Sequence, residues 1–219
     1  ALREKLNWFE RRPLFGRRIV LTRPRAQAGE AAQLLEDMGA DVILFPTIAI
    51  GPAPDPPAFD RAVAAAATYD WIVFTSVNGV RAFFDRFAAA RRDIRELASV
   101  RLAAIGPETA AELTRRLLRP AIVASEFRAE GLLEALAGEE LRGLRVLLPR
   151  AAGARAILPD TLRARGAHVD EALAYQSVLP PDADVAGLRA ALAAGEIDAV
   201  TFTSSSTVRS FVELLGADG

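Results

Sequence analysis

Few residues of this 219-residue chain could do chemistry, and their scarcity excludes several kinds of site. The sequence has no cysteine and one histidine, so iron–sulfur clusters, thiol nucleophiles and metal sites built on several histidines are excluded. His168 follows a glycine and an alanine and opens a strand-like run, which favours a solvated strand start over a catalytic triad. The single lysine, Lys5, lies in a charged N-terminal segment, so neither a Walker-type phosphate loop nor a Schiff base is expected. Hydroxyls, carboxylates, arginines and backbone amides remain.

Polar residues gather where predicted strands end. In parallel α/β sheets, ligands bind at the carboxyl ends of the strands, where helix N-termini present free N–H groups and a partial positive charge. Hydroxyls and amides at such positions suit carboxylates or phosphates. Serine, threonine and asparagine are also preferred N-caps, so capping alone stays an alternative for each of them. The candidate binding residues at these strand ends are Arg23, Thr75, Ser76, Asn78, Gly106, Thr109, Arg150, Thr203, Ser204, Ser205 and Ser206.

Two arginines and a tyrosine stand out among the candidates. Arg23 and Arg150 occupy equivalent strand ends, where they either solvate the surface or form charge-assisted contacts with an anionic ligand. Tyr175 lies in a segment expected to cross between two lobes, where it would border a cleft. A phenol with a pKa of about 10 can donate a proton or a hydrogen bond without being charged at pH 7. The alternative for Tyr175 is packing against one lobe with its hydroxyl satisfied.

The elements that must position these residues form a duplicated unit. Both copies of the last recurring segment contain Phe-Thr-Ser and continue into Val-Arg-x-Phe. Repeated order at a nearly constant offset indicates two copies of one supersecondary arrangement. Three segments recur, with 16–21 matching 143–148, 39–42 matching 166–169, and 70–76 matching 198–204.

Each copy has the pattern of a short apolar strand, an amphipathic helix, a glycine and another strand, which predicts parallel sheets flanked by helices. Proline-dense residues 51–57 predict an extended connection, and 179–182 are their counterpart.

The fold class is therefore α/β, with two similar parallel-sheet lobes joined by a two-stranded connector. We assign 14–47 with 180–219 to the first lobe, 48–179 to the second, and 1–13 to a linker or a remnant of an upstream partner. Strands are predicted at 19–21, 42–45, 71–74, 101–105 and 121–124, and helices at 28–38, 79–90, 107–118 and 130–136.

Composition narrows the functional classes further. With 27 basic and 28 acidic residues, the chain is not a strongly basic nucleic-acid binder. No apolar run approaches the roughly 20 residues that span a bilayer, and no signal peptide is visible, so we expect a cytoplasmic location without membrane contact. A two-lobed small-molecule binding or sensor module without catalysis stays an alternative to an enzyme.

In order along the chain, several motifs resemble those of the uroporphyrinogen-III synthase family. The resemblance runs from Leu14 to the end of the chain. It is carried by Gly-Arg-Arg-Ile-Val-Leu-Thr-Arg-Pro-Arg at 16–25, Gly-Ala-Asp at 39–41 with Phe-Pro at 45–46, Phe-Thr-Ser-Val-Asn-Gly-Val at 74–80, Ile-Gly-Pro-Glu-Thr-Ala at 105–110, Ala-Tyr-Gln at 174–176, and Thr-Phe-Thr-Ser-Ser-Ser at 201–206.

The resemblance implies two α/β lobes with the active site in the cleft between them, and neither cofactor nor metal. It implies an enzyme that acts on the linear tetrapyrrole hydroxymethylbilane, expels its hydroxyl, closes the macrocycle and inverts ring D through a spiro intermediate. We expect this part of the protein to be a monomer. Tyr175 matches the family's connector tyrosine, which is proposed to help the hydroxyl leave. Residues 2–10 also look like the tail of uroporphyrinogen-III methyltransferases, which implies a fused or neighbouring methyltransferase as a partner.

The two copies differ in how far they continue. The first runs from Ser76 through the Gly-Pro box at 106–107 to Leu136, whereas the chain ends at Gly219, soon after the matching Ser204. We therefore expect a piece of a longer protein, whose first lobe lacks a strand-helix-strand-helix segment with a second Gly-Pro box. On this interpretation, these residues alone have weak activity or none.

Overall fold

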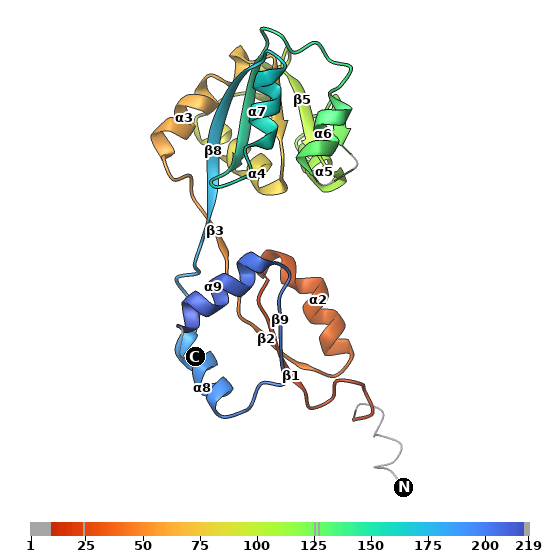
Figure 1. Cartoon of the computed structure of the whole chain (residues 1–219), viewed down its shortest axis with the longest axis vertical. Helices are drawn as coiled ribbons and strands as arrows, with labels where there is room; N and C mark the ends of the chain where they lie inside the picture. The colour runs from red at the N-terminus through yellow and green to blue at the C-terminus, as the bar shows by residue number, and fades with distance from the viewer. Residues whose placement is uncertain (1–9, 24, 125, 127, 217–219) are drawn as a thin grey trace. The chain divides into compact units, whose positions relative to one another are not determined.

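A computed structural model describes residues 10–23, 25–124, 126 and 128–216. The chain separates into two compact units (Figure 1). Unit 1 is Ala1–Ala49 with Val178–Gly219, and unit 2 is Ile50–Ser177. The predicted α/β class is confirmed, since both units contain parallel strands with flanking helices.

Unit 1 has a three-stranded sheet in the order β2-β1-β9, with both neighbours parallel to β1. Its buried core is small and centres on Val20, Phe45, Leu188 and Leu215. The predicted helix before Gly39 is present, and it ends one residue earlier than Met38. The elements are β1 (Arg18–Leu21), α2 (Arg25–Asp37), β2 (Asp41–Leu44), α8 (Val185–Ala193), β9 (Ala199–Thr201) and α9 (Ser205–Leu215).

Unit 2 has a six-stranded sheet in the order β3-β8-β7-β4-β5-β6. Two apolar clusters cover its faces: α3, α4 and α5 contribute Phe59, Phe83 and Leu113 to one, while α6 and α7 contribute Leu132 and Leu162 to the other. The strands are β3 (Ala49–Gly51), β4 (Trp71–Phe74), β5 (Arg101–Ile105), β6 (Ile122–Ala124), β7 (Arg145–Ala151) and β8 (His168–Val178). The helices are α3 (Pro56–Ala64), α4 (Val77–Ala89), α5 (Pro107–Thr114), α6 (Ala129–Ala135) and α7 (Ile157–Ala164), with short 3₁₀ turns at Ala66–Thr68 and Ile94–Leu97.

One predicted element is wrong. Residues 51–57 were expected to be extended throughout, but helix α3 begins at Pro56. The Asp55 carboxylate accepts a hydrogen bond from the Ala58 N–H at 2.9 Å and caps the helix. Proline fits the first helical turn, where its missing N–H has no partner to lose. Proline density therefore marked a helix start as well as a connection.

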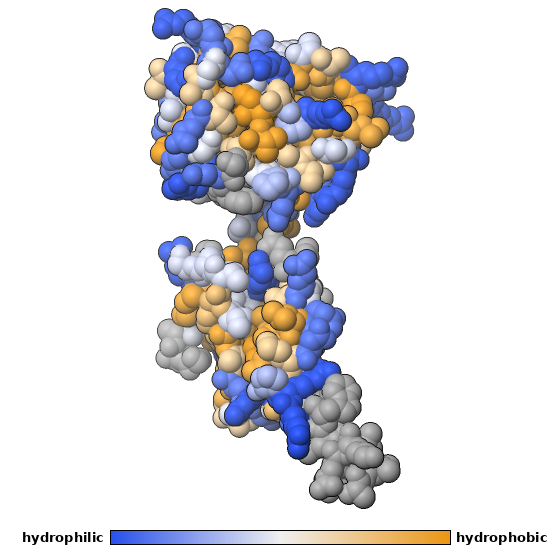
Figure 2. Space-filling model, turned by 90° about the vertical axis from the view of Figure 1, so that its right-hand side faces the viewer, coloured by the Kyte–Doolittle hydropathy of each residue, from blue (hydrophilic) through white to orange (hydrophobic). Residues whose placement is uncertain are grey.

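Apolar side chains also reach the surface of both units. Figure 2 shows them gathered in patches between charged groups on the side facing the viewer. In unit 1 the exposed apolar residues include Leu34, Phe202 and Val212. Within the part of the chain that the structure describes, no helix combines the length and apolar character needed to cross a membrane.

Candidate active site

The candidate site is built around a contact between Tyr175 and Ser76 in unit 2. The Tyr175 hydroxyl and the Ser76 hydroxyl oxygen lie 2.9 Å apart. The Tyr175 side chain belongs to the cluster under α4, and the residue is only 9% exposed. Ser76 also caps α4, because its hydroxyl oxygen accepts a hydrogen bond from the Gly79 N–H at 3.0 Å. Capping and the tyrosine contact therefore coexist at one serine.

This arrangement leaves a proton available. A serine hydroxyl has one donor and two acceptor lone pairs, so Ser76 can accept from Gly79 and still donate to Tyr175. When Ser76 is the donor in this hydrogen bond, the phenol proton of Tyr175 is free to pass to another group. The N-terminus of α4, with its partial positive charge, adjoins the same hydroxyl and favours an anion nearby. The pair can therefore serve as a proton donor beside an anion-binding helix end.

The topology of unit 2 brings the other predicted residues of this unit to the same sheet edge. Strands β8, β7, β4 and β5 are adjacent and parallel, so their carboxyl ends share one edge. Thr75 and Asn78 are half-buried at the start of α4. Gly106 precedes α5 with a φ of +78°, which favours glycine, and Thr109 is buried in the first turn. Two helix N-termini thus lie at this edge.

Arg150, a candidate for contact with an anionic ligand, is buried inside unit 2. The residue is 4% exposed, and its guanidinium donates to Glu171 Oε2 at 2.9 Å and to the Arg155 carbonyl at 2.7 Å. These contacts occupy the guanidinium inside unit 2. Its sequence counterpart Arg23 is half-buried after β1 in unit 1. Equivalent positions in the repeat therefore have different surroundings.

The remaining predicted residues lie in unit 1, after β9. Ser204 caps α9 by accepting from the Thr207 N–H at 3.2 Å, and its own N–H donates to the Thr207 hydroxyl at 3.2 Å. Thr203 and Ser205 are exposed beside this cap, while the side chain of Ser206 lies outside the described residues. Because β1 and β9 are parallel, Arg23 and these hydroxyls share the carboxyl edge of their own sheet.

Unit 1 also contains a pocket of about 300 Å³ that holds none of the predicted site residues. Its lining is apolar apart from two aspartates, of which Asp184 caps α8 by accepting from the Gly187 N–H at 2.8 Å. The pocket is lined by Ile43, Leu44, Phe45, Pro46, Asp182, Ala183, Asp184, Gly187, Leu188 and Ala191.

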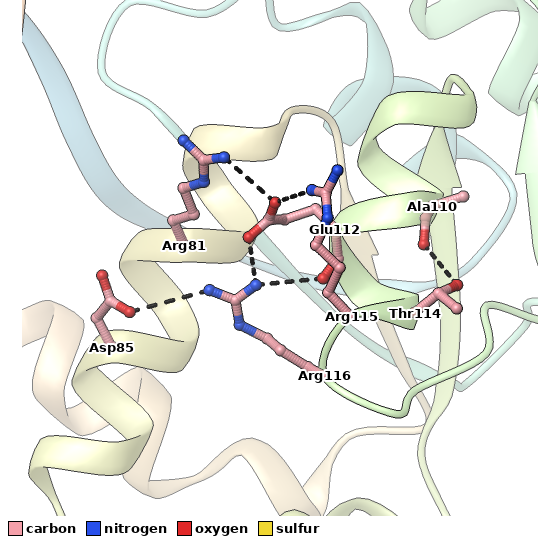
Figure 3. A network of polar contacts seen from close by, with 7 residues as sticks. All are labelled: Arg81, Asp85, Ala110, Glu112, Thr114, Arg115 and Arg116. Carbon is pink, nitrogen blue, oxygen red and sulfur yellow. Dashed lines mark hydrogen bonds and ion pairs between the residues drawn. The ribbon is translucent and has the colours of Figure 1, made fainter. Parts of the chain in front are cut away.

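Glu112 of α5 forms a buried polar network that the sequence analysis does not predict. Its side chain is 5% exposed and receives hydrogen bonds from Arg116, from Arg115 at 2.6 Å and from Arg81 of α4 at 3.3 Å (Figure 3). Burial alone raises the pKa of this carboxyl, but the hydrogen bonds from the arginines outweigh it and lower the pKa to about 2. The spacing of Glu112 from Arg115 and Arg116 is visible in the sequence. The link to Arg81, which ties α5 to α4, is not.

The second tyrosine has a different environment. Tyr69 donates a hydrogen bond to Asp170 Oδ2 at 2.7 Å, and the Arg145 guanidinium lies over its ring. Burial, together with the hydrogen bond and charge of Asp170, raises the pKa of the Tyr69 phenol to about 12. Its proton is held by a carboxylate, so Tyr69 has the character of a structural tyrosine. Among the described residues, no group of three or more histidines, aspartates or glutamates is placed to hold a metal ion.

Comparison with known proteins agrees with the fold and the motifs. A uroporphyrinogen-III synthase from Synechococcus elongatus is 35% identical over 210 residues, covering 94% of this chain and 77% of that protein. A crystal structure of a mutant uroporphyrinogen III synthase from Thermus thermophilus matches with a TM-score of 0.65 at 26% identity, covering 90% of this chain and 76% of that one. A partial match, 30% identical over 110 residues, covers 50% of this chain and 22% of a uroporphyrinogen-III C-methyltransferase from Bacillus subtilis. Residues 29–219 match the family model described as uroporphyrinogen-III synthase HemD, and the chain belongs to this family.

Proposed function

We propose that Tyr175, held by Ser76, donates the proton with which the hydroxyl of hydroxymethylbilane leaves as water. The observation that carries this proposal is the 2.9 Å contact between the two hydroxyls. With Ser76 donating to the phenol oxygen, the tyrosine proton points away from Ser76 and is available to the leaving group. The loss of water creates an electrophilic carbon on ring A, which the substituted carbon of ring D attacks to form a spiro intermediate. The bond between that ring D carbon and the bridge to ring C then breaks, and the bridge carbon bonds instead to the unsubstituted α-carbon of ring D. The proton that this α-carbon loses restores the phenol.

We assign substrate binding to the helix N-termini and the hydroxyls at the carboxyl edges of the sheets. The substrate carries many carboxylates, and the N-termini of α4 and α5 offer N–H groups and positive partial charge near Thr75, Asn78 and Gly106. Unit 1 offers Arg23 and the hydroxyls of Thr203, Ser204 and Ser205. Arg150 is omitted from this set because its guanidinium is bound to Glu171 and to a backbone carbonyl. Holding the substrate in one geometry favours the inverted ring D, since the free bilane closes to the uninverted isomer.

Replacement of Tyr175 by phenylalanine tests the proton donor. We expect Tyr175→Phe to lower the rate of type III product formation by about a hundredfold, because general acid catalysis contributes on the order of 10²–10⁴. The ring stays and fills the same space, so folding is largely kept. The matched control is Tyr69→Phe, which removes the other phenol of the unit and should leave the rate near that of the unaltered chain.

The assay must resolve type III from type I uroporphyrinogen, since the substrate closes spontaneously. An unchanged type III rate in Tyr175→Phe would remove this residue from the mechanism. Type I product alone, at the uncatalysed rate from the unaltered protein, would contradict the proposed activity itself.

A methyltransferase partner is a separate part of the proposal. It is supported by residues 2–10, which look like the tail of uroporphyrinogen-III methyltransferases, and by the partial match to one such enzyme. The product of one enzyme is the substrate of the other, so proximity would shorten transfer. Faster methylation with the two activities joined than with the two proteins separate, at equal concentrations, would support the partnership; equal rates would contradict it.

A further inference from the structure

Strand β8 contains one extra residue beside Tyr175. Strands β7 and β8 are paired in register from Arg145 opposite His168 to Arg150 opposite Leu173. The next pair is Ala151 opposite Tyr175, so Ala174 has no counterpart on β7. Such a bulge interrupts the alternation of side chains and turns the following residue to the other face.

The alternation before the bulge shows which face is which. Asp170 contacts Tyr69, and Ala172 and Ala174 pack in the same cluster as Phe83 of α4. Glu171, between them, contacts Arg163 of α7 on the opposite face.

Unbroken alternation would therefore place Tyr175 on the α7 face with Glu171. The bulge places it instead in the α4 cluster, where its hydroxyl meets Ser76. The register shift thus decides whether the phenol and the cap of α4 are neighbours.

Arg150 is the residue of β7 directly before the register shift. Its side chain contacts both β8 and the loop that follows β7. Its guanidinium holds Glu171 of β8 at 2.9 Å and the Arg155 carbonyl at 2.7 Å. The loop between β7 and α7 that contains Arg155 also contains Ala152, whose N–H donates to the Tyr175 carbonyl at 2.8 Å. Burial strengthens these charge-assisted bonds and makes their loss costly, because the acceptors would be left unsatisfied.

We propose that Arg150 is a positioning residue that fixes the register shift in β8 and thereby holds the Tyr175 hydroxyl against Ser76. Its effect on turnover rests on the proposed role of Tyr175 as proton donor. Its effect on the position of Tyr175 does not depend on that role.

The test uses the fact that the chain has two tyrosines. The full chain is labelled with carbon-13 at the tyrosine Cζ, and the two signals are assigned with Tyr69→Phe. Arg150→Met removes the guanidinium but keeps an unbranched side chain that can fill much of the same space. This substitution should shift or broaden the Tyr175 signal and leave the Tyr69 signal in place.

The matched control is Arg163→Met, because Arg163 contacts the other oxygen of Glu171 at 3.0 Å but not the carbonyl of Arg155. This control should leave both signals unchanged. A folded Arg150→Met protein with both signals at their original positions would overturn the proposal. If Arg150→Met does not fold, Arg150→Lys replaces it, since lysine keeps the charge but loses the planar fork; a Tyr175 signal identical to that of the unaltered protein would then count against the proposal.

Turnover separates this inference from the proposed function. Arg150→Met should lower kcat about tenfold, because misplacing a reacting group is costly, and should have no further effect in a Tyr175→Phe background. Additive losses would contradict positioning through Tyr175. If the unaltered protein forms no type III product, the proposed function fails, while the tyrosine signals still decide the role of Arg150.

Discussion

The two Phe-Thr-Ser segments of the repeat have nearly the same sequence but different surroundings. Ser76 and Ser204 both cap the following helix by accepting a backbone hydrogen bond three residues later. That residue is Gly79 in one copy and Thr207 in the other. Thr207 closes a reciprocal cap with its side chain, whereas Gly79 lies against the backbone of β7.

The sheets explain the difference. Strand β4 is fully buried between β7 and β5, and β8, on the other side of β7, brings Tyr175 to Ser76. Strand β9 is partly exposed, and no tyrosine occurs in the sequence of unit 1. A hydroxyl at a strand end therefore becomes a component of a site only where another strand of the same sheet supplies a partner.

The largest expected difference in stability between the copies concerns the third residue of the helix after each Phe-Thr-Ser segment, which is Gly79 in α4 and Thr207 in α9. A Cβ at Gly79 would lie 2.9 Å from the Pro149 carbonyl oxygen, which is backbone and cannot rotate away. We expect Gly79→Ala to lower the free energy of unfolding by about 2–3 kcal/mol through overpacking. Thr207→Ala, its counterpart, should cost about 1 kcal/mol through the loss of a cap. Urea unfolding measures both, and equal costs would mean that α4 can move off β7.

The next largest effect concerns the pH dependence of stability that Glu112 produces by linking α5 to α4. Glu112, with its pKa lowered to about 2 against an ordinary 4.5, stabilises the fold when ionised. That contribution is fully present above about pH 4.5 and is lost as the pH falls toward 2. We expect Glu112→Gln to be less stable at pH 7 by about 2 kcal/mol, because charge-assisted hydrogen bonds from the arginines to a nearly buried group are weakened.

The stability difference between Glu112→Gln and the unaltered protein should shrink as the pH is lowered through this window, since protonated glutamate resembles glutamine. Glu139→Gln is a control, because Glu139 pairs with Arg101 at 2.5 Å near the surface, where solvent screens the attraction and the loss of the pair should have a smaller effect. A Glu112 difference that is constant between pH 7 and 2 would show that the charge is not what holds α5 to α4.

The smallest expected effect on stability distinguishes the two serines. Ser76→Ala and Ser204→Ala should each cost about 1 kcal/mol, because each removes an N-cap acceptor. Their effects on the labelled tyrosines should differ: Ser76→Ala shifts the Tyr175 signal, and Ser204→Ala leaves both signals in place. If neither substitution moved the Tyr175 signal, the hydroxyl contact that carries the proposed function would not exist in solution.

Much of the fold could be predicted from local patterns. Apolar runs such as 71–74 and 101–105 coincide with β4 and β5, and the glycine after α2 marks its end. The sequence does not predict helix α3, because the proline density of 51–57 favours an extended chain, although Asp55 before the two prolines is a typical cap. The equal roles expected for Arg23 and Arg150 did not anticipate the buried contacts of Arg150, since identical repeat positions do not determine which side chains face them.

The sequence by itself determined the chemistry available, since one histidine and no cysteine leave hydroxyls, carboxylates and arginines. It also determined the repeat, the strand end where Ser76 was expected and the crossing segment where Tyr175 was expected. Only the tertiary structure decided that these two residues meet. Side-chain alternation along a strand is a local property, whereas the extra residue at Ala174 exists only in the pairing of β8 with β7. The same holds for Glu112, whose partner Arg81 comes from another helix.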